Sequence, residues 1–464
     1  MSIWNRFKEI FGVSPVSIDE VRQHALKIKT ESEIRPKSRN TSLDDIEITE
    51  EYRQIFKWIT AGAPIVFVSG KAGTGKTTFV RYLRKEFDKN LVVVAPTGVA
   101  ALNIEGATIH SFFRFPPLII IDTDIQYVRD RKLYTKMSLL VIYEASMVRA
   151  DIIDGIDKFL RKNREIDEPF GGVQVLLVGD LFQLPPVLNR REAEAFQLMG
   201  YDSPYFFSAK AFKKSQMVSK ELSKIFRQSD ENFIQILNRV RQAEALDIVI
   251  PSLNQRHGPS VSSTETVITL TCTNRIADQI NDMHLNKLPG EPKTYVGEVS
   301  GKFALEDEKL PSPINLSLKV GAQVMFTKND DQKRWVNGTL GKVVELNDSI
   351  RVEIQDKYRT VIHDVQKVKW EAFKYEYDDY QDRIVPSRTG EYIQYPLMLA
   401  WAVTIHKSQG KTLEKVRVDL GEGAFDFGQV YVALSRCRSL EDIHLVRPIK
   451  ANDIKCDPVI KRFY

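Results

Sequence analysis

Short apolar runs recur along the first half of the chain, separated by longer stretches in which apolar and polar residues mix. Four of these runs indicate buried strands, at residues 64–68, 91–95, 139–142 and 175–178. The stretch after the first run repeats its apolar positions at helical spacing, from Phe79 to Phe87. Continuous apolar strands that alternate with helices are typical of a parallel sheet covered on both faces. The pattern therefore predicts an α/β fold, whose ligands bind at the carboxyl ends of the strands.

The second half of the chain repeats this pattern and then changes. Residues 267–270 form another apolar run, and α/β character returns at residues 396–402. Between about 313 and 392, short segments alternate apolar and polar residues around an Asn-Gly turn at Asn337, which predicts a small antiparallel β insertion. We therefore expect an amphipathic helix and linker at 1–45, a first α/β unit at 46–210, and a second at 211–464 with an insertion at 313–392.

A glycine-rich loop follows the first apolar run. From Gly70 to Thr77 it has the form G-x-x-x-x-G-K-T, between a predicted strand and a predicted helix. In such a loop the glycines allow backbone N–H groups to surround phosphate oxygens, and the helix N-terminus adds its dipole. Lys76 would neutralise the β and γ phosphates, and the Thr77 hydroxyl can bind Mg²⁺. The loop therefore predicts a nucleotide-binding site.

Composition narrows the class of protein only slightly. Of 464 residues, 43% are hydrophobic and 27% are charged, as in ordinary soluble globular proteins. The net charge of +5 is compatible with a nucleic-acid partner but does not require one. The three cysteines, Cys272, Cys437 and Cys456, have neither disulfide nor zinc-ligand spacing. With no membrane-length apolar run and no signal-peptide pattern, we expect a cytoplasmic protein with reduced thiols, nucleoid-associated in a bacterium.

Phosphoryl transfer needs further groups beside a phosphate loop. Glu144, just after the third apolar run, is the candidate base, and Gln183 stands where a γ-phosphate sensor would. Arg227 and Arg436, both in the second α/β unit, are candidate arginine fingers. Taken singly, each has an ordinary alternative, because a surface arginine is usually solvated and a glutamate after a strand is often a helix cap.

In this order, the residues resemble superfamily-1 helicases of the 5′-to-3′ branch, specifically the Pif-type family related to RecD. The resemblance extends from about residue 60 to residue 440. Its most informative pieces lie at residues 72–77, 95–101, 169–174, 179–187, 226–228, 404–410 and 431–436. The Pro-Phe-Gly-Gly sequence at 169–172 is the piece specific to the family.

The resemblance implies two RecA-like motor domains that bind ATP and Mg²⁺ in the cleft between them. It also implies a strand-separating wedge at residues 115–135 and an SH3-like identity for the β insertion. The implied activity is ATP-driven 5′-to-3′ movement on single-stranded DNA with unwinding of duplex DNA. The implied partners are single-stranded and 5′-tailed duplex DNA, with G-quadruplex DNA as a further candidate, and the implied working unit is a monomer without membrane contact.

The resemblance also assigns roles to individual residues. The implied catalytic residues are Lys76, Glu144, Gln183, Arg227 and Arg436. The implied nucleotide-binding residues are Gly73, Thr74, Gly75, Lys76, Thr77, Thr78, Gln183, Arg227, Gly410 and Arg436. The implied DNA contacts are Pro96, Thr97, His110 and Phe113 in the first domain and Thr273, Asn274, His406, Ser408 and Gln409 in the second. Phe113 would stack on a base, although burial in the core is the alternative for this side chain.

Position 143 departs from the family pattern. The family ends this strand with Asp-Glu, and its aspartate holds Mg²⁺, whereas this chain has Tyr143 and Glu144. A phenol with a pKa of about 10 cannot supply that negative charge at neutral pH, and its size would crowd the metal position. Asp180, after the next strand, is a candidate for partial compensation. Two hypotheses therefore stand: a helicase whose hydrolysis Tyr143 impairs, and a nucleotide-gated single-stranded DNA-binding protein without turnover.

Overall fold

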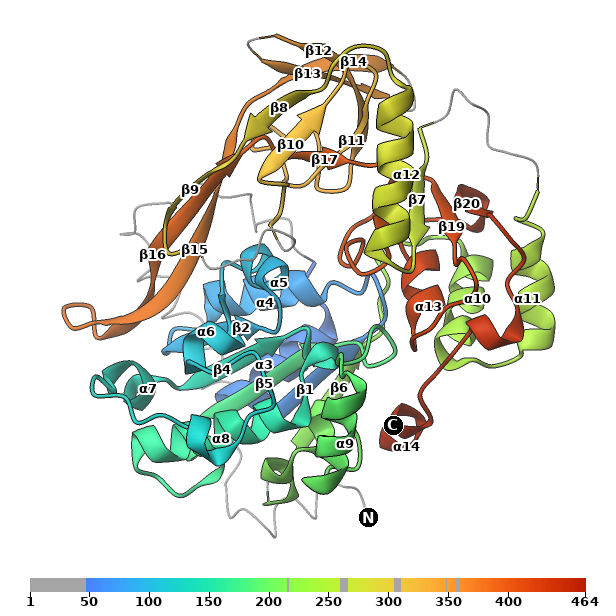
Figure 1. The fold of residues 1–464 in the computed structure, drawn as a ribbon. Helices are drawn as coiled ribbons and strands as arrows, with labels where there is room; N and C mark the ends of the chain where they lie inside the picture. Colours follow the sequence, from blue (N-terminus) through green and yellow to red (C-terminus); the bar gives the residue numbers. More distant parts are fainter. Residues whose placement is uncertain (1–46, 215–216, 259–265, 304–309, 348, 356–358) are drawn as a thin grey trace. The chain divides into compact units, whose positions relative to one another are not determined.

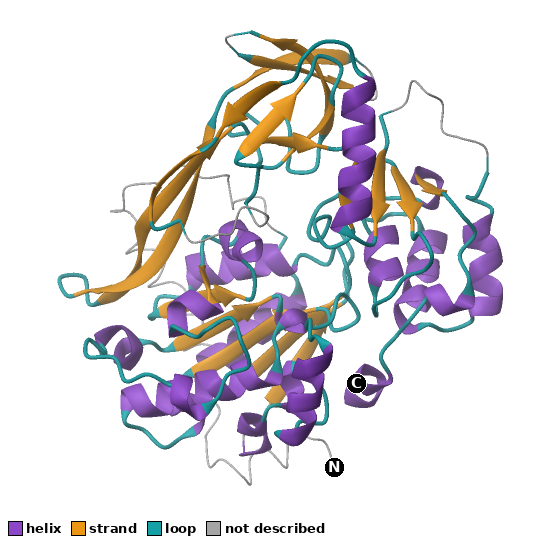
Figure 2. Ribbon diagram, viewed as in Figure 1, coloured by secondary structure: helices purple, strands orange, loops and turns teal. Residues whose placement is uncertain are grey.

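The structure is a computed structural model of the chain (Figures 1 and 2). It describes residues 47–214, 217–258, 266–303, 310–347, 349–355 and 359–464. The helix and linker expected at residues 1–45 lie outside these ranges. Within the ranges, every helix is too short or too polar to cross a membrane.

The first parallel sheet is built from the apolar runs of the first half of the chain. Its strands are β1 (Ile65–Gly70), β2 (Leu91–Ala95), β3 (Ala107–Thr108), β4 (Leu139–Tyr143), β5 (Gln174–Gly179) and β6 (Met217–Leu222). They lie in the order β3-β2-β4-β5-β1-β6, and each neighbouring pair is parallel. The predicted α/β fold is confirmed. Because β6 pairs with β1, the first sheet extends beyond residue 210, where we expected the first unit to end.

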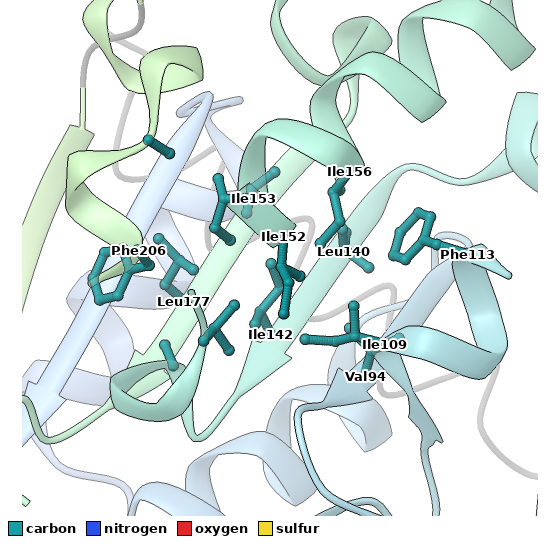
Figure 3. Close-up of a cluster of buried hydrophobic side chains, with 14 of the residues drawn as sticks. Val94, Ile109, Phe113, Leu140, Ile142, Ile152, Ile153, Ile156, Leu177 and Phe206 are labelled. Atoms are coloured by element: carbon teal, nitrogen blue, oxygen red, sulfur yellow. The ribbon is translucent and has the colours of Figure 1, made fainter. Parts of the chain in front are cut away.

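Helices cover this sheet and bury its apolar side chains. The helices of the first unit are α3 (Glu50–Thr60), α4 (Lys76–Glu86), α5 (Gly98–Asn103), α6 (Ile109–Phe113), α7 (Lys132–Lys136), α8 (Ala150–Arg164) and α9 (Arg190–Leu198). In α8, Ile152, Ile153 and Ile156 face the strands that carry Leu140 and Leu177, and all five are buried (Figure 3). Burying a side chain of this size contributes roughly 1.5–3 kcal/mol, so this layer fixes where the strand ends lie.

Buried aspartates of α8 hold loops of the first unit in place. Asp151 accepts a hydrogen bond from the backbone N–H of Ile120 at 2.8 Å, and Asp157 accepts one from that of Phe170 at 2.6 Å. Phe170 belongs to the Pro-Phe-Gly-Gly sequence, has a positive φ of 54° and is 1% exposed. The sequence that is specific to the family therefore serves here as part of the scaffold.

A second parallel sheet is formed later in the chain. Its strands β7 (Ile268–Thr271), β18 (Ala402–Thr404), β19 (Val416–Asp419) and β20 (Ile443–Leu445) lie in the order β18-β7-β19-β20. The accompanying helices are α10 (Glu231–Gln242), α11 (Leu246–Asn254), α12 (Asn274–Lys287) and α13 (Gln429–Leu434), whereas α14 (Pro458–Phe463) packs on the core of the first unit. The run at 396–402 divides between two sheets, because β17 (Leu397–Leu399) joins the β insertion and β18 joins this one. The described residues therefore include two parallel α/β units.

The chain between α12 and β18 forms antiparallel sheets. Its strands are β8 (Lys293–Val296), β9 (Glu298–Gly301), β10 (Asn315–Leu318), β11 (Gln323–Phe326), β12 (Leu340–Leu346), β13 (Ile350–Gln355), β14 (Thr360–Val365), β15 (Val368–Asp378), β16 (Arg383–Gln394) and β17. A 5-stranded sheet in the order β14-β13-β12-β11-β17 surrounds a core that includes Phe326 and Trp335. The predicted antiparallel insertion is confirmed, and it begins earlier than residue 313 because β8 pairs with β10.

The longest strands, β15 and β16, form a hairpin that contacts the first unit. Tyr375 of β15 is 5% exposed and belongs to the core of that unit, where its hydroxyl accepts from the N–H of Val93 at 3.1 Å. Lys136 of α7 forms an ion pair with Asp382, at the end of the hairpin, with an N–O distance of 3.0 Å. The insertion is thus attached to the first sheet as well as to the second.

Candidate functional site

The predicted phosphate loop connects β1 to α4. Gly73 and Gly75 both have a φ of 84°, a left-handed conformation that favours glycine at both positions. Lys76 begins α4, and its Nζ donates to the carbonyl oxygens of Gly70 at 2.7 Å and Lys71 at 3.0 Å. The ammonium group therefore lies along the loop, in position to meet phosphate oxygens.

Tyr143 reaches the same loop from the end of β4. Its hydroxyl oxygen lies 2.6 Å from Oγ1 of Thr77, and the two groups form a hydrogen bond. The side chain is 6% exposed, and burial raises the pKa of the phenol, with the charge of Glu144 adding to the shift. Tyr143 is therefore neutral at physiological pH and engages the hydroxyl that was expected to bind Mg²⁺.

The residues around Thr77 do not fit a Mg²⁺ ion held by the protein. Mg²⁺ requires oxygen ligands in near-octahedral geometry and usually binds through one or two carboxylates. In the part of the chain that the structure describes, His, Cys, Asp and Glu form no group of three or more that could hold a metal. Asp180 is fully buried, and its oxygens accept from Arg241 at 3.0 Å and from Gln183 at 3.2 Å. The suggested compensation by Asp180 is therefore not supported, because its carboxylate already has these partners.

Glu144 follows Tyr143 and has a left-handed backbone conformation, with a φ of 56°. Burial raises the pKa of Glu144, while the positive charges of Lys76 and Arg436 oppose the shift. Burial also lowers the pKa of Lys76. A carboxylate whose pKa lies closer to neutrality is a more effective proton acceptor, which is the property that a general base needs.

The two candidate arginine fingers lie near this cluster. Arg227 Nη1 donates to the carbonyl oxygen of Ser435 at 3.1 Å, and a Cβ at Gly73 would lie 2.6 Å from that of Arg227. Arg436 is 1% exposed, and its Nε donates to the carbonyl oxygen of Val432 at 2.8 Å. Burial lowers the pKa of Arg436 to about 9, with the charge of Arg227 adding to the shift. Backbone carbonyls thus hold both guanidinium groups, and phosphate oxygens could take the place of those carbonyls.

Gln183, the expected γ-phosphate sensor, is hydrogen-bonded to Gln409, one of the expected DNA contacts. Its Oε1 accepts from Nε2 of Gln409 at 3.3 Å, while its Nε2 donates to Asp180 at 3.2 Å. Gln183 comes from the loop after β5, and Gln409 from the turn after β18. One amide pair therefore joins the two α/β units at the site.

Arg241 and Tyr431 belong to the site although no role was expected for either. The Tyr431 hydroxyl accepts from the N–H of Ala72 at 2.9 Å and donates to Asp180 at 3.2 Å. Arg241 forms a buried ion pair with the same aspartate, at 3.0 Å. Tyr431 lies within the motif at residues 431–436, but nothing in the sequence around Arg241 distinguishes it from the other arginines.

Two aromatic residues border the phosphate loop and were also missed. The Tyr52 hydroxyl donates to the carbonyl oxygen of Gly75 at 2.8 Å. The N–H of Phe226 donates to the carbonyl oxygen of Gly73 at 2.8 Å, and its side chain is 49% exposed. The sequence marks Phe226 only by placing it directly before Arg227.

The expected DNA contacts follow parallel strands in both units. Thr97 follows β2 and caps α5 by accepting from the N–H of Ala100 at 3.2 Å. Thr273 follows β7 and caps α12 by accepting from the N–H of Ile276 at 3.4 Å. The two threonines therefore occupy equivalent places in the two sheets. The other expected contacts that are at least partly exposed are Pro96, His110, Asn274, His406 and Gln409.

Two of the expected DNA contacts are buried instead. Phe113 lies among the buried hydrophobic side chains of the first unit (Figure 3). It is 0% exposed and packs against Phe115 and Phe159. Ser408 is 0% exposed, and its Oγ donates to the carbonyl oxygen of Ile405 at 2.7 Å. Phe113 therefore presents no ring face to a base, and the core alternative describes it. The Ser408 hydroxyl is therefore engaged in a hydrogen bond within its own turn.

The fold and the site define a P-loop nucleotide-binding protein with two RecA-like sheets. A family model described as PIF1-like helicase matches residues 47–248, and one described as DNA helicase Pif1, 2B domain, matches residues 306–346. The human ATP-dependent DNA helicase PIF1 is 34% identical over 434 residues, and the Pif1 helicase of Bdellovibrio bacteriovorus is 33% identical over 431 residues. The chain belongs to the PIF1-like helicase family.

The matched regions differ in how much of each relative they cover. They include 90% of this chain in both cases, but 63% of the human protein and 92% of the Bdellovibrio protein. The chain therefore spans less than two thirds of the human relative. The crystal structure of Bacteroides sp Pif1 in complex with ADP-AlF4 has a TM-score of 0.83 at 40% identity, covering 90% of this chain and 96% of that one. The Bacteroides Pif1 structure bound to ssDNA has the same identity and coverage, with a TM-score of 0.66.

Proposed function

We propose that this protein is an ATP-dependent DNA helicase that moves 5′ to 3′ along single-stranded DNA. The observation that carries the proposal is that Arg227 lies against Gly73 of the phosphate loop, where a Cβ on the glycine would come within 2.6 Å of the arginine Cβ. The same side chain donates at 3.1 Å to the carbonyl oxygen of Ser435, which directly precedes Arg436 of the second unit. The phosphate loop and the groups proposed to stabilise charge therefore meet at one place. The names of the human and Bdellovibrio relatives, and the ssDNA bound to the Bacteroides protein, support the assignment.

The proposed mechanism uses the two units as the walls of the ATP site. The phosphate loop and Lys76 bind the phosphates. Glu144 accepts the proton of the attacking water. Arg227 and Arg436 exchange their carbonyl contacts for γ-phosphate oxygens, which draws the second unit inward, and loss of that phosphate releases them. Because Thr97 and Thr273 lie on different units, this cycle changes the distance between two DNA contacts and produces a step.

Residues 115–135 are proposed to separate the strands. Ile120 and Val128 are both 4% exposed and anchor this stretch in the core of the first unit. Between and beside them, Leu118 is 63% exposed and Tyr127 is 52% exposed. A stretch with a fixed base and exposed apolar side chains is suited to intrude between base pairs.

The alternative proposal is a nucleotide-gated single-stranded DNA-binding protein without turnover. The observation in its favour is the hydrogen bond between Tyr143 and Thr77, which leaves the phosphate loop intact but removes a metal ligand. We favour a helicase with impaired hydrolysis, because the chain retains Lys76, Glu144 and Gln183, which the proposed mechanism uses. The rate of ATP hydrolysis by the Tyr143→Asp variant, relative to that of the unaltered chain, separates the two proposals.

Affinity for single-stranded DNA is expected to depend strongly on salt and weakly on sequence. Small hydroxyl and amide groups such as Thr97 and Asn274 suit contacts to phosphate rather than to base edges. The association constant should fall by about tenfold or more between about 50 and 200 mM salt. Fluorescence anisotropy with oligo(dT) and mixed-sequence strands measures both effects, and a flat salt response would contradict the proposal.

G-quadruplex DNA is also proposed as a ligand, and a G-quadruplex oligonucleotide can be titrated in the same anisotropy assay. The protein is proposed to be a monomer, and light scattering measures its mass in solution.

Unwinding is expected to require a 5′ overhang. The measurement compares two duplexes of identical sequence, one with a 5′ tail and one with a 3′ tail, using the Tyr143→Asp variant so that hydrolysis does not limit the assay. The 5′-tailed duplex should be unwound while the 3′-tailed duplex stays annealed, because 5′-to-3′ movement along a 3′ tail leads away from the junction. Faster unwinding of the 3′-tailed duplex would remove the assignment to the 5′-to-3′ branch.

A further inference from the structure

The last residues of the chain leave the second unit and pack on the first. After β20 the chain reaches α14, whose Ile460 is 1% exposed and belongs to the hydrophobic core of the first unit. Phe463 stacks on Phe207 of the first unit, with ring centres 4.3 Å apart and an angle of 16° between planes. We name residues 455–464 the strap, because they tie the second sheet to the core of the first.

The strap ends on the sensor loop. The ring of Tyr464 stacks on that of Phe182, with centres 5.5 Å apart and 24° between planes. Phe182 directly precedes Gln183, is 7% exposed, and has the guanidinium carbon of Arg241 4.1 Å from its ring centre. The position of Phe182 is thus set by one side chain of the strap and one side chain of α10.

The backbone beside Gln183 is held by the second unit as well. A Cβ at Gly428 would lie 2.5 Å from the carbonyl oxygen of Phe182 and 2.6 Å from that of Gln183, so only glycine allows this approach. The N–H of Gly428 donates to the carbonyl oxygen of Lys455, the first residue of the strap, at 3.1 Å. The strap therefore touches the sensor loop directly at one end and through Gly428 at the other.

One side of the strap faces a hollow rather than packed side chains. The hollow has a volume of about 690 Å³ and is lined by Val459, Arg462 and Phe463 of the strap and by Phe207 and Phe212 of the first unit. Because this side is uncovered, the strap buries less surface than a fully packed helix would.

We propose that the strap positions the γ-phosphate sensor Gln183 by fixing the ring of Phe182 against Tyr464. Tyr464 and Phe182 are positioning residues in this proposal, since neither needs to touch the nucleotide. When the second unit moves, the strap moves with it and carries the change to the loop that holds Gln183. The inference rests on the proposed function, in which Gln183 senses the γ-phosphate.

The test compares the affinities of ADP and of the non-hydrolysable analogue AMPPNP, both with Mg²⁺, by calorimetry. The ratio of the two dissociation constants isolates recognition of the γ-phosphate and does not depend on turnover, so the chain can be used with Tyr143 in place. The variants are Tyr464→Ala, which removes the stacked ring, and Tyr464→Phe, which retains it. Arg462→Ala is the matched control, because Arg462 is an exposed residue of α14 two positions before Tyr464.

Tyr464→Ala is expected to reduce the preference for AMPPNP over ADP by about threefold to tenfold, the range for loss of a stacked aromatic pair. Affinity for ADP should stay the same, and Tyr464→Phe and Arg462→Ala should keep the full preference. A change of both affinities together, or no change in the preference, would overturn the proposal. Gln183→Ala tests the sensor role of Gln183 separately from the positioning role of the strap. If this variant still prefers AMPPNP over ADP, the sensor role is wrong and the strap inference fails with it. If Gln183→Ala abolishes the preference and Tyr464→Ala does not, only the strap inference fails.

Discussion

Replacing Tyr143 by aspartate is expected to raise ATP hydrolysis stimulated by single-stranded DNA by about a hundredfold. The phenol oxygen of Tyr143 lies 2.6 Å from Oγ1 of Thr77 and carries no charge at neutral pH. An aspartate is shorter, so it would release the Thr77 hydroxyl and place a carboxylate in the same region. A hydroxyl and a carboxylate beside nucleotide phosphates form a donor set that suits Mg²⁺. Steady-state release of phosphate at saturating oligo(dT) measures the change.

Tyr143→Phe is the matched control for this experiment. It removes the hydrogen bond to Thr77 but adds no negative charge, and the ring keeps most of the volume. We expect its rate to stay close to that of the unaltered chain. If Tyr143→Phe matches Tyr143→Asp, the trapped Thr77 hydroxyl limits hydrolysis and the missing charge does not. If the aspartate variant is no faster than the unaltered chain, then position 143 does not limit turnover and Tyr143 does not impair hydrolysis.

The parts of the fold that follow from local patterns could be read from the sequence. The four apolar runs of the first half of the chain correspond to β1, β2, β4 and β5, and the glycine-rich loop lies between β1 and α4. β6 was assigned to the wrong unit because it is an edge strand. Of its residues, Met217 to Leu222, only Leu222 is buried, and three polar residues separate the apolar pair at its start from Leu222. An edge strand has few buried positions, so hydrophobicity does not mark it.

The parts of the site that depend on packing between distant segments could not be read in the same way. Phe112 and Phe113 are adjacent aromatics, and only the position of α6 over the core shows that both are buried. The partner of Asp180 is Arg241, 61 positions further along the chain, and no local pattern selects that arginine. The strap could not be predicted either, because Ile460 and Phe463 look like ordinary apolar positions of a short helix in the second unit.

Replacing Arg241 by methionine is expected to lower the free energy of unfolding by about 3–5 kcal/mol, the usual cost of breaking a buried ion pair. Arg241 is 4% exposed and Asp180 is 0% exposed, so solvent cannot replace the lost partner. Methionine preserves much of the side-chain length, which keeps the loss of packing small. Denaturant unfolding followed by fluorescence measures the change. Arg239→Met, on the same helix and only partly buried, is the matched control and should change stability by less than about 1 kcal/mol.

The pH dependence shows whether the unpaired carboxylate causes that loss. Burial opposes ionisation of Asp180, yet Arg241 and Lys76 hold its pKa below the ordinary value of 3.8. In the unaltered protein this contribution is present above about pH 4 and is lost as the pH falls through the folded pKa. In Arg241→Met, the guanidinium charge that counteracts the effect of burial is absent, so the pKa of Asp180 should rise. The stability difference between the two proteins should therefore narrow as the pH is lowered from about 7 towards 5.

The double variant Asp180→Asn with Arg241→Met separates charge from packing. It removes both members of the pair, while asparagine can still accept the hydrogen bond from Tyr431. If the unpaired carboxylate accounts for the loss, the double variant should recover at least about 2 kcal/mol relative to Arg241→Met, because no buried charge is left uncompensated. If it recovers nothing, the cost arises instead from the lost contact between Arg241 and the ring of Phe182. The pair would then act on the sensor loop mainly through that ring, which also stacks on Tyr464 of the strap.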